Sequence, residues 1–430
     1  MNKLIILIFA ILFLNNCSFN KDLNNSKDNE QLKDSSIKKL FDEKKIFSQE
    51  FNPELELDLT NIQIRKNIIE NKNNYGFQNY EGLFNKIANY KFSKLENIND
   101  INYKPLFLSD GIIFFDKKGS ILRYNEEGKV IWKKNYYSKS EKKLKPKLNF
   151  LNDNGNLIVT DDIAKYYSID INTGELNWSK NSKYPFNSEI KKNKNKFFVV
   201  DYNNTLRCYY LNDGSECWNL QTQESFTISS LKYSLIIIND LIIFTNSIGD
   251  VTAVNAETGL IIWQLPTQSS SIINEAYSFK ISKLVSDDNS IYFSNNKNQF
   301  YSIETKTGSV NWINDINSYI LPIINDNLIF TISNEGYLFV IEKNNGNIIR
   351  ITDLFKDYKT KKRKNIKPIG FVIGNTNLYL TNSDGKMVIV DLKLGNVINI
   401  IKVSKNLTSQ PFLFNNNLYV IRNGSIIQYD

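Results

Sequence analysis

The stretch AVNAETGLIIW, Ala253 to Trp263, consists of two short apolar runs joined by a turn that ends in Gly259. Gly259 precedes Trp263 by four residues, and each of the five tryptophans in the protein follows a glycine at that same distance. Tryptophans placed by chance would not share one position, so the sequence contains an internal repeat. The pairs are Gly128 and Trp132, Gly174 and Trp178, Gly214 and Trp218, Gly259 and Trp263, and Gly308 and Trp312.

Two more copies of the repeat keep the glycine and lose the tryptophan. EKNNGNIIR contains Gly346 and Arg350, and DLKLGNVIN contains Gly395 and Asn399. The glycines recur every 38 to 49 residues. This is the period of a four-stranded propeller blade and is too long for most helical repeats.

Each repeat has room for four strands. A second turn, opened by Gly or Asn as at Gly249, lies nine or ten residues before the repeat glycine, and both residue types tolerate the positive φ of hairpin turns. An apolar run such as NLIVTD from Asn156 precedes this turn in eight places, and a further run such as YILPIIND from Tyr319 precedes that one. The sequence therefore predicts an all-β fold, an eight-bladed β-propeller of four-stranded antiparallel blades.

The eighth repeat has one strand fewer than the others. After Gly424 the chain continues only as SIIQYD to Asp430, which would leave unpaired N–H and C=O groups at a sheet edge. The run KIANYKFSKL, Lys86 to Leu95, is strand-like and precedes the first blade. We expect this N-terminal strand to close the ring, so that the propeller comprises residues 84–430.

The N-terminal region has three parts. Residues 1–16 are typical of an export signal, because Lys3 is followed by an apolar run shorter than a membrane span. Cys17 and Ser18 follow, as in bacterial lipoproteins that are lipidated on this cysteine and sorted to the outer membrane. Since the preceding residues are not small, an uncleaved or ordinarily secreted N-terminus is the alternative. The polar residues 17–44 predict a flexible tether, and residues 45–83 predict an extended segment along the propeller or a partner.

Several kinds of chemistry are missing from the sequence. It has no histidine, which removes Ser-His-Asp and Cys-His nucleophile systems and histidine metal ligands. The glycines occur one per turn and form no phosphate-binding loop. Carboxylates near the turns, such as Asp170 and Asp391, are explained by hairpin hydrogen bonds. We therefore expect no catalytic residues, no metal site and no cofactor.

The net charge of +8 is concentrated in two loops, residues 138–147 and 356–367. Solvated loops explain these lysines, and contact with anionic lipid or an acidic partner is the alternative. Nucleic acid is not expected as a partner, because no basic face is interleaved with aromatic residues.

Two cysteines, Cys208 and Cys217, lie on the two arms of the hairpin around Gly214. They form either a cross-strand disulfide in an oxidising compartment or two free core thiols. No Cys-x-x-Cys spacing indicates a metal or redox centre.

The units SIDINTGELNW, AVNAETGLIIW and SIETKTGSVNW resemble the repeats of PQQ-type propellers, in which the tryptophan docks between adjacent blades. Two periplasmic families use this repeat. The quinoprotein dehydrogenases are longer and carry an adjacent Cys-Cys pair that this chain lacks. The BamB lipoproteins of the outer-membrane β-barrel assembly (BAM) complex are similar in the signal, Cys17, the tether, eight blades and the closing strand.

The resemblance to BamB implies a non-catalytic scaffold without a cofactor, lipid-anchored at the periplasmic face of the outer membrane. Its implied partners are the POTRA domains of the barrel-inserting subunit BamA, other subunits of the complex and unfolded outer-membrane protein clients. BamB contacts BamA through a leucine-rich turn with a basic residue, which Leu231 and Lys232 match between the third and fourth blades; ordinary packing is the alternative for Leu231. The alternative function is a PQQ-type quinoprotein or another periplasmic propeller that binds a ligand in its central channel.

Overall fold

The computed structural model describes residues 49–60, 63–65, 73–95, 103–223, 231–267, 280–405 and 408–430. The chain divides into two units, Met1–Lys45 and Ile46–Asp430, and only the second is described. The predicted signal, Cys17 and the tether over residues 17–44 lie outside the described residues. Within the described ranges, no helix is long and apolar enough to cross a membrane.

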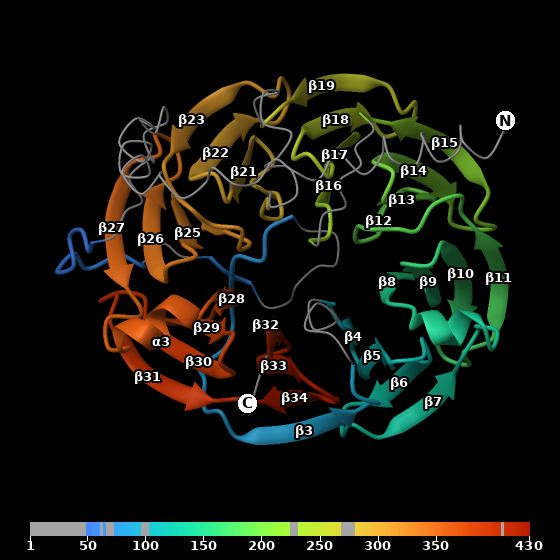
Figure 1. Ribbon diagram of the computed structural model, residues 1–430, viewed down its shortest axis with the longest axis horizontal. Helices are drawn as coiled ribbons and strands as arrows, with labels where there is room; N and C mark the ends of the chain where they lie inside the picture. The colour runs from blue at the N-terminus through green and yellow to red at the C-terminus, as the bar shows by residue number, and fades with distance from the viewer. Residues whose placement is uncertain are drawn as a thin grey trace, which may run out of the picture. The chain divides into compact units, whose positions relative to one another are not determined.

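Eight antiparallel blades surround a centre in a ring (Figure 1). In each of the first seven blades, four consecutive strands run from the centre to the rim, which confirms the predicted eight-bladed all-β propeller. Blades 1 to 4 are β4 (Leu106–Leu108), β5 (Gly111–Phe115), β6 (Ile121–Asn125), β7 (Val130–Lys134); β8 (Leu148–Asp153), β9 (Asn156–Asp161), β10 (Lys165–Asp170), β11 (Leu176–Asn181); β12 (Lys191–Asn193), β13 (Lys196–Val200), β14 (Thr205–Tyr210), β15 (Glu216–Gln221); and β16 (Leu235–Ile238), β17 (Leu241–Thr245), β18 (Val251–Asn255), β19 (Ile261–Leu265). Blades 5 to 7 are β20 (Val285–Ser286), β21 (Ser290–Asn295), β22 (Gln299–Glu304), β23 (Val310–Asn314); β24 (Ile323–Asn325), β25 (Leu328–Ile332), β26 (Tyr337–Glu342), β27 (Ile348–Asp353); and β28 (Pro368–Ile373), β29 (Asn377–Asn382), β30 (Lys386–Asp391), β31 (Val397–Lys402).

The eighth blade joins the two ends of the propeller. Its inner strands are β32 (Thr408–Phe414), β33 (Asn417–Arg422) and β34 (Ser425–Tyr429), and its outer strand is β3 (Lys86–Lys91). Strand β3 pairs antiparallel with β34 from Lys86 opposite Tyr429 to Lys91 opposite Ser425. The prediction that an N-terminal strand closes the ring is therefore confirmed.

A repeated β-bulge aims each tryptophan at the next blade. In blade 4, Ala253 pairs with Trp263 and Val254 with Ile261, so Ile262 is an extra residue in the outer strand. A bulge turns the side chains beyond it, and the ring of Trp263 lies against Gly308 of blade 5, where an added Cβ would come within 2.6 Å of the ring. The glycine is needed because it lies under the tryptophan of the preceding blade.

The core lies between neighbouring blades. The second and third strands of each blade are almost wholly buried, as in β13 and β14, whereas the fourth strand of blade 3, β15, carries exposed and half-buried residues. Apolar side chains on both faces of each inner strand therefore pack against the two adjacent blades, which is why these runs read as continuous apolar segments in the sequence.

The described residues 49–60, 63–65 and 73–85, here called the strap, lie against blade 4 and blades 6 to 8. Phe51 exchanges two backbone hydrogen bonds with Ile351 of β27, 3.1 and 2.9 Å long, at the rim of blade 6. Strand β2 (Phe77–Gln78) pairs in parallel with the innermost strand β28, and β1 (Ile64–Arg65) pairs in parallel with β2. The chain thus passes from the rim into the central channel and returns to the rim as β3 (Figure 1).

Candidate functional site

Two asparagines of the strap close the edges of inner strands in the channel. Asn73 Nδ2 donates to the carbonyl of Ile237 at 2.7 Å, and Asn74 Nδ2 donates to that of Ile324 at 2.7 Å. The N–H groups of Ile237 and Ile324 donate back to the same two side chains at 3.4 and 3.2 Å. A carboxamide offers one donor side and one acceptor side, as a peptide group does. Each asparagine therefore pairs with a blade edge as a neighbouring strand would.

An apolar anchor follows these asparagines. Phe77 is fully buried, and its ring lies 5.5 Å from that of Phe330 in blade 6. Further along, Tyr80 is buried against Tyr379 of blade 7 and donates its hydroxyl to the carbonyl of Asp430 at 3.0 Å. The strap is therefore bound to blades 4, 6, 7 and 8, and it fills the channel on the side of blades 6 and 7.

On the other side of the channel, basic side chains gather around two adjoining cavities of about 80 and about 40 Å³. Lys104, Glu189 and Lys191 line both cavities, Lys232 lines the larger one and Lys283 the smaller one. Lys283 forms an ion pair with Glu189. Burial opposes ionisation of Glu189, but Lys283, Lys191 and Lys104 outweigh it and lower the pKa of this carboxyl. These five side chains are called the channel cluster below.

Lys232, which the sequence singles out for partner binding, is turned towards the channel. Its Nζ donates to Asn149 of blade 2 and lies 3.4 Å from the centre of the Tyr103 ring. Burial, above all, lowers the pKa of Lys232 well below its usual value. Leu231 is half-exposed, and its carbonyl accepts a hydrogen bond from Asn187 at 3.2 Å. A partner contact through Leu231 and Lys232 stays a prediction.

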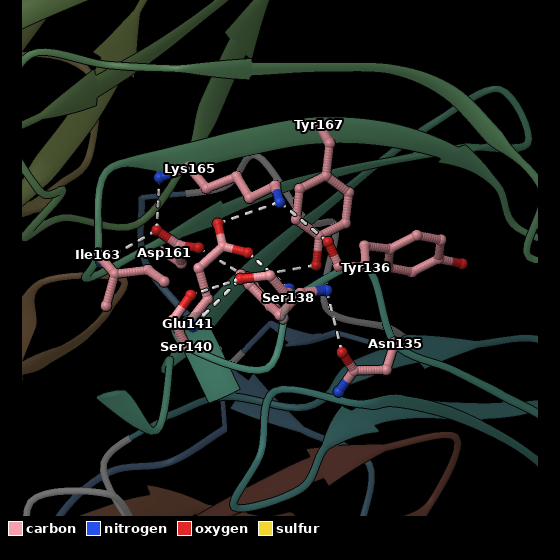
Figure 2. Close-up of polar contacts among 10 residues, drawn as sticks. Asn135, Tyr136, Ser138, Ser140, Glu141, Asp161, Ile163, Lys165 and Tyr167 are labelled. Carbon is pink, nitrogen blue, oxygen red and sulfur yellow. Dashed lines mark hydrogen bonds and ion pairs between the residues drawn. The ribbon is translucent and has the colours of Figure 1, made fainter. Parts of the chain in front are cut away.

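The basic loop of residues 138–147 is held in place by Glu141 and Lys165 (Figure 2). Glu141 accepts a hydrogen bond from the Ser138 N–H at 2.6 Å, and Lys165 Nζ lies 3.3 Å from Glu141 Oε1 and 2.9 Å from the carbonyl of Tyr136. The side chain of Leu144 at the end of this loop is 65% exposed. The loop therefore presents several lysines and one leucine to solvent from a fixed backbone.

The second basic loop carries a short helix, α3 (Thr360–Asn365). Within it, Arg363 pairs with Asp353 at 2.6 Å, and Lys362 lies 3.4 Å from Asp384. Aspartates of blades 6 and 7 therefore offset part of the positive charge of this loop.

Beneath the first basic loop lies a buried aspartate, Asp161. Its Oδ1 accepts hydrogen bonds from the N–H groups of Ile163 and Lys165 at 3.0 and 2.7 Å (Figure 2). Its Oδ2 accepts from the Tyr137 hydroxyl at 2.6 Å. Burial raises the pKa of Asp161 to about 7, because these hydrogen bonds do not fully replace the lost hydration.

Cys208 and Cys217 are free thiols in the structure. Cys208 is buried and lies opposite Trp218, whereas Cys217 is the extra residue of the bulge in β15. Burial, above all, raises the pKa of the Cys208 thiol. Whether the pair is oxidised in an oxidising compartment stays a prediction.

Arg350 has a role that the sequence analysis missed. It takes the tryptophan position of blade 6, is fully buried, and lies against Gly395 of blade 7. Its guanidinium donates to the carbonyls of Leu392, Lys393 and Leu55 at 2.7, 2.8 and 3.0 Å, and burial lowers its pKa to about 10. The missing tryptophan was visible in the repeat, but nothing in the sequence identified Leu55 of the strap as the partner.

Polar groups of these regions are engaged in hydrogen bonds and ion pairs within the protein. In the described ranges, no group of three or more His, Cys, Asp or Glu residues could hold a metal ion. The turn carboxylates are engaged as expected: Asp170 accepts from the N–H groups of Asn172 and Thr173, and Asp391 accepts from that of Leu394. What remains are hydrogen-bonding edges, basic loops and the channel cluster.

Known proteins similar to this chain share its fold. BamB from Moraxella catarrhalis has a TM-score of 0.63 and 16% identity, and covers 81% of this chain and 100% of its own. The quinohemoprotein alcohol dehydrogenase ADHIIG from Pseudomonas putida HK5 has a TM-score of 0.62 and 10% identity. The match covers 82% of this chain and 78% of the dehydrogenase. At these identities the likeness establishes the eight-bladed fold alone.

Comparisons of the sequence identify the family to which the chain belongs. An uncharacterized protein of Rickettsia conorii is 24% identical over 374 residues, which is 83% of this chain and 88% of that protein. A second uncharacterized protein, from Rickettsia prowazekii, is 24% identical over 342 residues, which is 75% of this chain and 81% of that protein. Residues 117–352, more than half of the chain, match the family described as outer membrane protein assembly factor BamB. The resemblance drawn from the repeats is thereby confirmed, and the chain belongs to the BamB family.

Proposed function

We propose that this protein is a non-catalytic scaffold of the outer-membrane β-barrel assembly complex, which binds the POTRA domains of BamA and aids the insertion of barrel proteins. The observation that carries the proposal is the match of residues 117–352 to the BamB family. A closed ring of eight blades suits a protein that holds partners in place.

The filled channel weighs against the alternative of a cofactor-dependent enzyme. The fold is shared with a quinohemoprotein alcohol dehydrogenase, but a shared fold does not establish a shared function. Here the strap residues Asn73, Asn74 and Phe77 occupy the channel, and the channel cluster lines what remains. The two cavities that the channel cluster lines, about 80 and about 40 Å³, are far smaller than the hundreds of Å³ of a typical cofactor site.

Lipid anchoring through Cys17 at the periplasmic face of the outer membrane is part of the proposal. A Cys17→Ser variant should disappear from the outer-membrane fraction without a change in folding. Retention of the variant in the outer-membrane fraction after a high-salt wash would contradict a lipid anchor.

The partner contact is tested by crosslinking the tagged full-length protein in outer-membrane extracts and identifying the captured proteins by mass spectrometry. Leu231→Glu should abolish recovery of BamA, because a charge replaces a half-exposed apolar side chain at the predicted contact. Leu394→Glu is the matched control, since Leu394 is exposed in a hairpin turn of blade 7. If the wild-type protein captures no assembly subunit, the scaffold function is wrong; if Leu231→Glu still captures BamA, only the contact is wrong.

A further inference from the structure

The two basic loops lie on the same face of the ring, although more than 200 positions separate them in the sequence. Residues 138–147 connect β7 to β8, and residues 356–367 connect β27 to β28, on different sides of the ring (Figure 1). Each connection runs from the outermost strand of one blade to the innermost strand of the next. Because a blade has four strands of alternating direction, the chain leaves it at the face where it entered. The connections between blades therefore share one face, here called the connection face.

The two loops concentrate the positive charge of the chain. Together they contain twelve basic and two acidic residues, a net charge of +10, whereas the whole chain has a net charge of +8. The connection face therefore carries a local excess of positive charge on two sides of the ring.

Nearby carboxylates offset only part of this charge. Asp353 pairs with Arg363 and Asp384 lies beside Lys362, while Glu141 pairs with Lys165, which is outside the loops. Two acidic residues close to the second loop, Glu50 of the strap and Asp357, are exposed. Besides Lys362, the exposed lysines of the two loops are Lys139, Lys143, Lys145, Lys356, Lys359, Lys361, Lys364 and Lys367.

The first loop also presents an apolar side chain among its lysines. Leu144 ends the short 3₁₀ helix η2 (Glu141–Leu144), lies between Lys143 and Lys145 in sequence, and is 65% exposed. The loop backbone is held by hydrogen bonds, such as that from the Lys142 N–H to the Ser138 carbonyl at 3.1 Å. Lysines beside an exposed apolar residue suit the interface of a bilayer, where ammonium groups stay at the headgroups and the apolar group enters the acyl boundary.

We propose that the connection face docks onto a lipid bilayer that contains anionic lipids, with the lysines of both loops at the lipid phosphates and Leu144 in the interface. Charge complementarity favours this occupant, because a bilayer presents negative charge over a whole plane and so reaches both loops at once. Leu231 precedes β16 on the same face, so a bilayer bound here covers the predicted contact with BamA. Binding to lipid does not depend on that contact, and either proposal can fail without the other.

The test is co-sedimentation of the full-length Cys17→Ser protein, which has no acyl chain, with lipid vesicles. One set of vesicles is phosphatidylcholine alone, and the other is an equal mixture of phosphatidylcholine and phosphatidylglycerol. We expect binding to the mixed vesicles that exceeds binding to phosphatidylcholine and weakens as salt screens the lysines. Residues 1–16 are the same in every variant, so differences between variants come from the propeller.

Paired substitutions locate the binding surface. Lys139→Gln with Lys143→Gln, and Lys361→Gln with Lys364→Gln, should each weaken binding by about fivefold for each lysine removed. Leu144→Ser should weaken binding by about tenfold at every salt concentration, because it removes apolar contact and no charge.

The matched control is Lys194→Gln with Lys306→Gln. It removes the same charge from two exposed lysines in turns within blades 3 and 5, which lie on the opposite face of the ring. This double variant should bind the mixed vesicles like the parent protein.

Circular dichroism identifies variants that fail to fold. The proposal is overturned if the mixed vesicles bind no more protein than phosphatidylcholine does, or if both folded lysine pairs bind like the control. Polyglutamate serves as an acidic peptide for comparison. A protein that binds polyglutamate but not the mixed vesicles has an acidic protein as its partner, which also contradicts the proposal.

Discussion

At the scale of single residues, the side chain at one position of the repeat has different interaction partners in different blades. The residue at the end of the second strand accepts hydrogen bonds from two N–H groups of the following turn in blades 1 to 4, through Asp116, Asp161, Asp201 and Asn246. In blades 1 and 3, the second carboxylate oxygen pairs with a cation, Lys133 or Arg207, both at 2.7 Å. In blade 2, the second carboxylate oxygen, that of Asp161, accepts a hydrogen bond from the Tyr137 hydroxyl instead of pairing with a cation.

This difference predicts a pH-dependent stability from Asp161, whose pKa burial raises to about 7. The folded state holds the proton more tightly than the unfolded chain, where an aspartate titrates near about 4. The free energy of unfolding therefore falls as the pH rises from about 4 to about 7. Asp161→Asn should gain roughly 2–4 kcal/mol relative to wild type between pH 4 and pH 8, as measured by urea unfolding.

The matched control for this prediction is Asp201→Asn at the same position in blade 3. This change leaves the buried Arg207 without its closest carboxylate partner, so it should cost about 3 kcal/mol at pH 8. Equal pH profiles for wild type and Asp161→Asn would show that Asp161 is ionised at neutral pH.

Arg350 gives a second prediction at this scale. Trp263 and Trp312 donate their Nε1–H to the carbonyls of Thr305 and Lys343 in the next blade, and Arg350 makes the corresponding bond to Leu392. Arg350→Trp should therefore keep the packing between blades 6 and 7 but lose the hydrogen bond to Leu55. Hydrogen exchange should become faster in residues 49–60 and at Ile351, whose N–H donates to Phe51, and stay unchanged in β26.

Arg350→Ala is the comparison variant, because it removes both the packing between blades 6 and 7 and the hydrogen bond to Leu55. It should lower the free energy of unfolding by about 2–4 kcal/mol, because it leaves a cavity and removes the side-chain donor from the buried Leu392 carbonyl. If residues 49–60 keep their protection in both variants, Arg350 does not hold the strap.

At the scale of elements, the closing strand β3 is distant in sequence from the three other strands of its blade. Tyr90 in this strand is buried, its hydroxyl lies 2.7 Å from Gln428 Oε1 and 3.0 Å from the Glu126 carbonyl oxygen, and its ring packs edge-on against Tyr124. It thus links blade 8 to blade 1.

Tyr90→Ala should lower the free energy of unfolding by about 3–5 kcal/mol, since it removes a large buried aromatic ring. Hydrogen exchange in β34 should increase at the same time, because β3 then covers the edge of β34 less tightly. Ile87→Ala in the same strand, where the side chain is 53% exposed, should change stability by less than about 0.5 kcal/mol. Similar effects of the two substitutions would show that β3 is not a structural part of the ring.

The elements of the propeller could be predicted from the sequence because each blade is a local unit. Its turns are marked by Gly and Asn, and its strands are apolar runs that follow one another directly. The missing outer strand and its donor near Lys86 could also be predicted, since an open edge needs a partner. The path of the strap could not, because Asn73 and Asn74 bind backbone groups about 160 and 250 positions away, and such pairing has no local pattern. The inward turn of Lys232 was missed for the same reason.

At the scale of the whole molecule, the ring and the strap contribute differently. All strands of the eight blades come from residues 86–430, whereas the strap adds contacts at the rim of blade 6 and in the channel. The ring should therefore fold without the strap, and the strap should stabilise it and limit access to the channel.

A variant that lacks residues 46–80 should keep the circular dichroism spectrum of a β-protein and melt at a lower temperature. Amide exchange at Ile237 and Ile324 should increase by about tenfold or more, because Asn73 and Asn74 no longer cover these strand edges. The double variant Asn73→Ala and Asn74→Ala should reproduce the faster exchange in the full-length chain. Loss of the β spectrum in the shortened variant would show instead that the strap is required for the ring.

The hydrogen bond from Tyr80 to the carbonyl of Asp430 joins groups 350 positions apart, and this separation bears on the order of events during folding. The strap and β3 precede the blades in the chain, whereas blades 6 to 8, to which they bind, come last. The strands of each of the first seven blades are neighbours in sequence, so these blades can assemble before the distant contacts form. Ring closure is then the final and slowest step, because the most distant contacts form last.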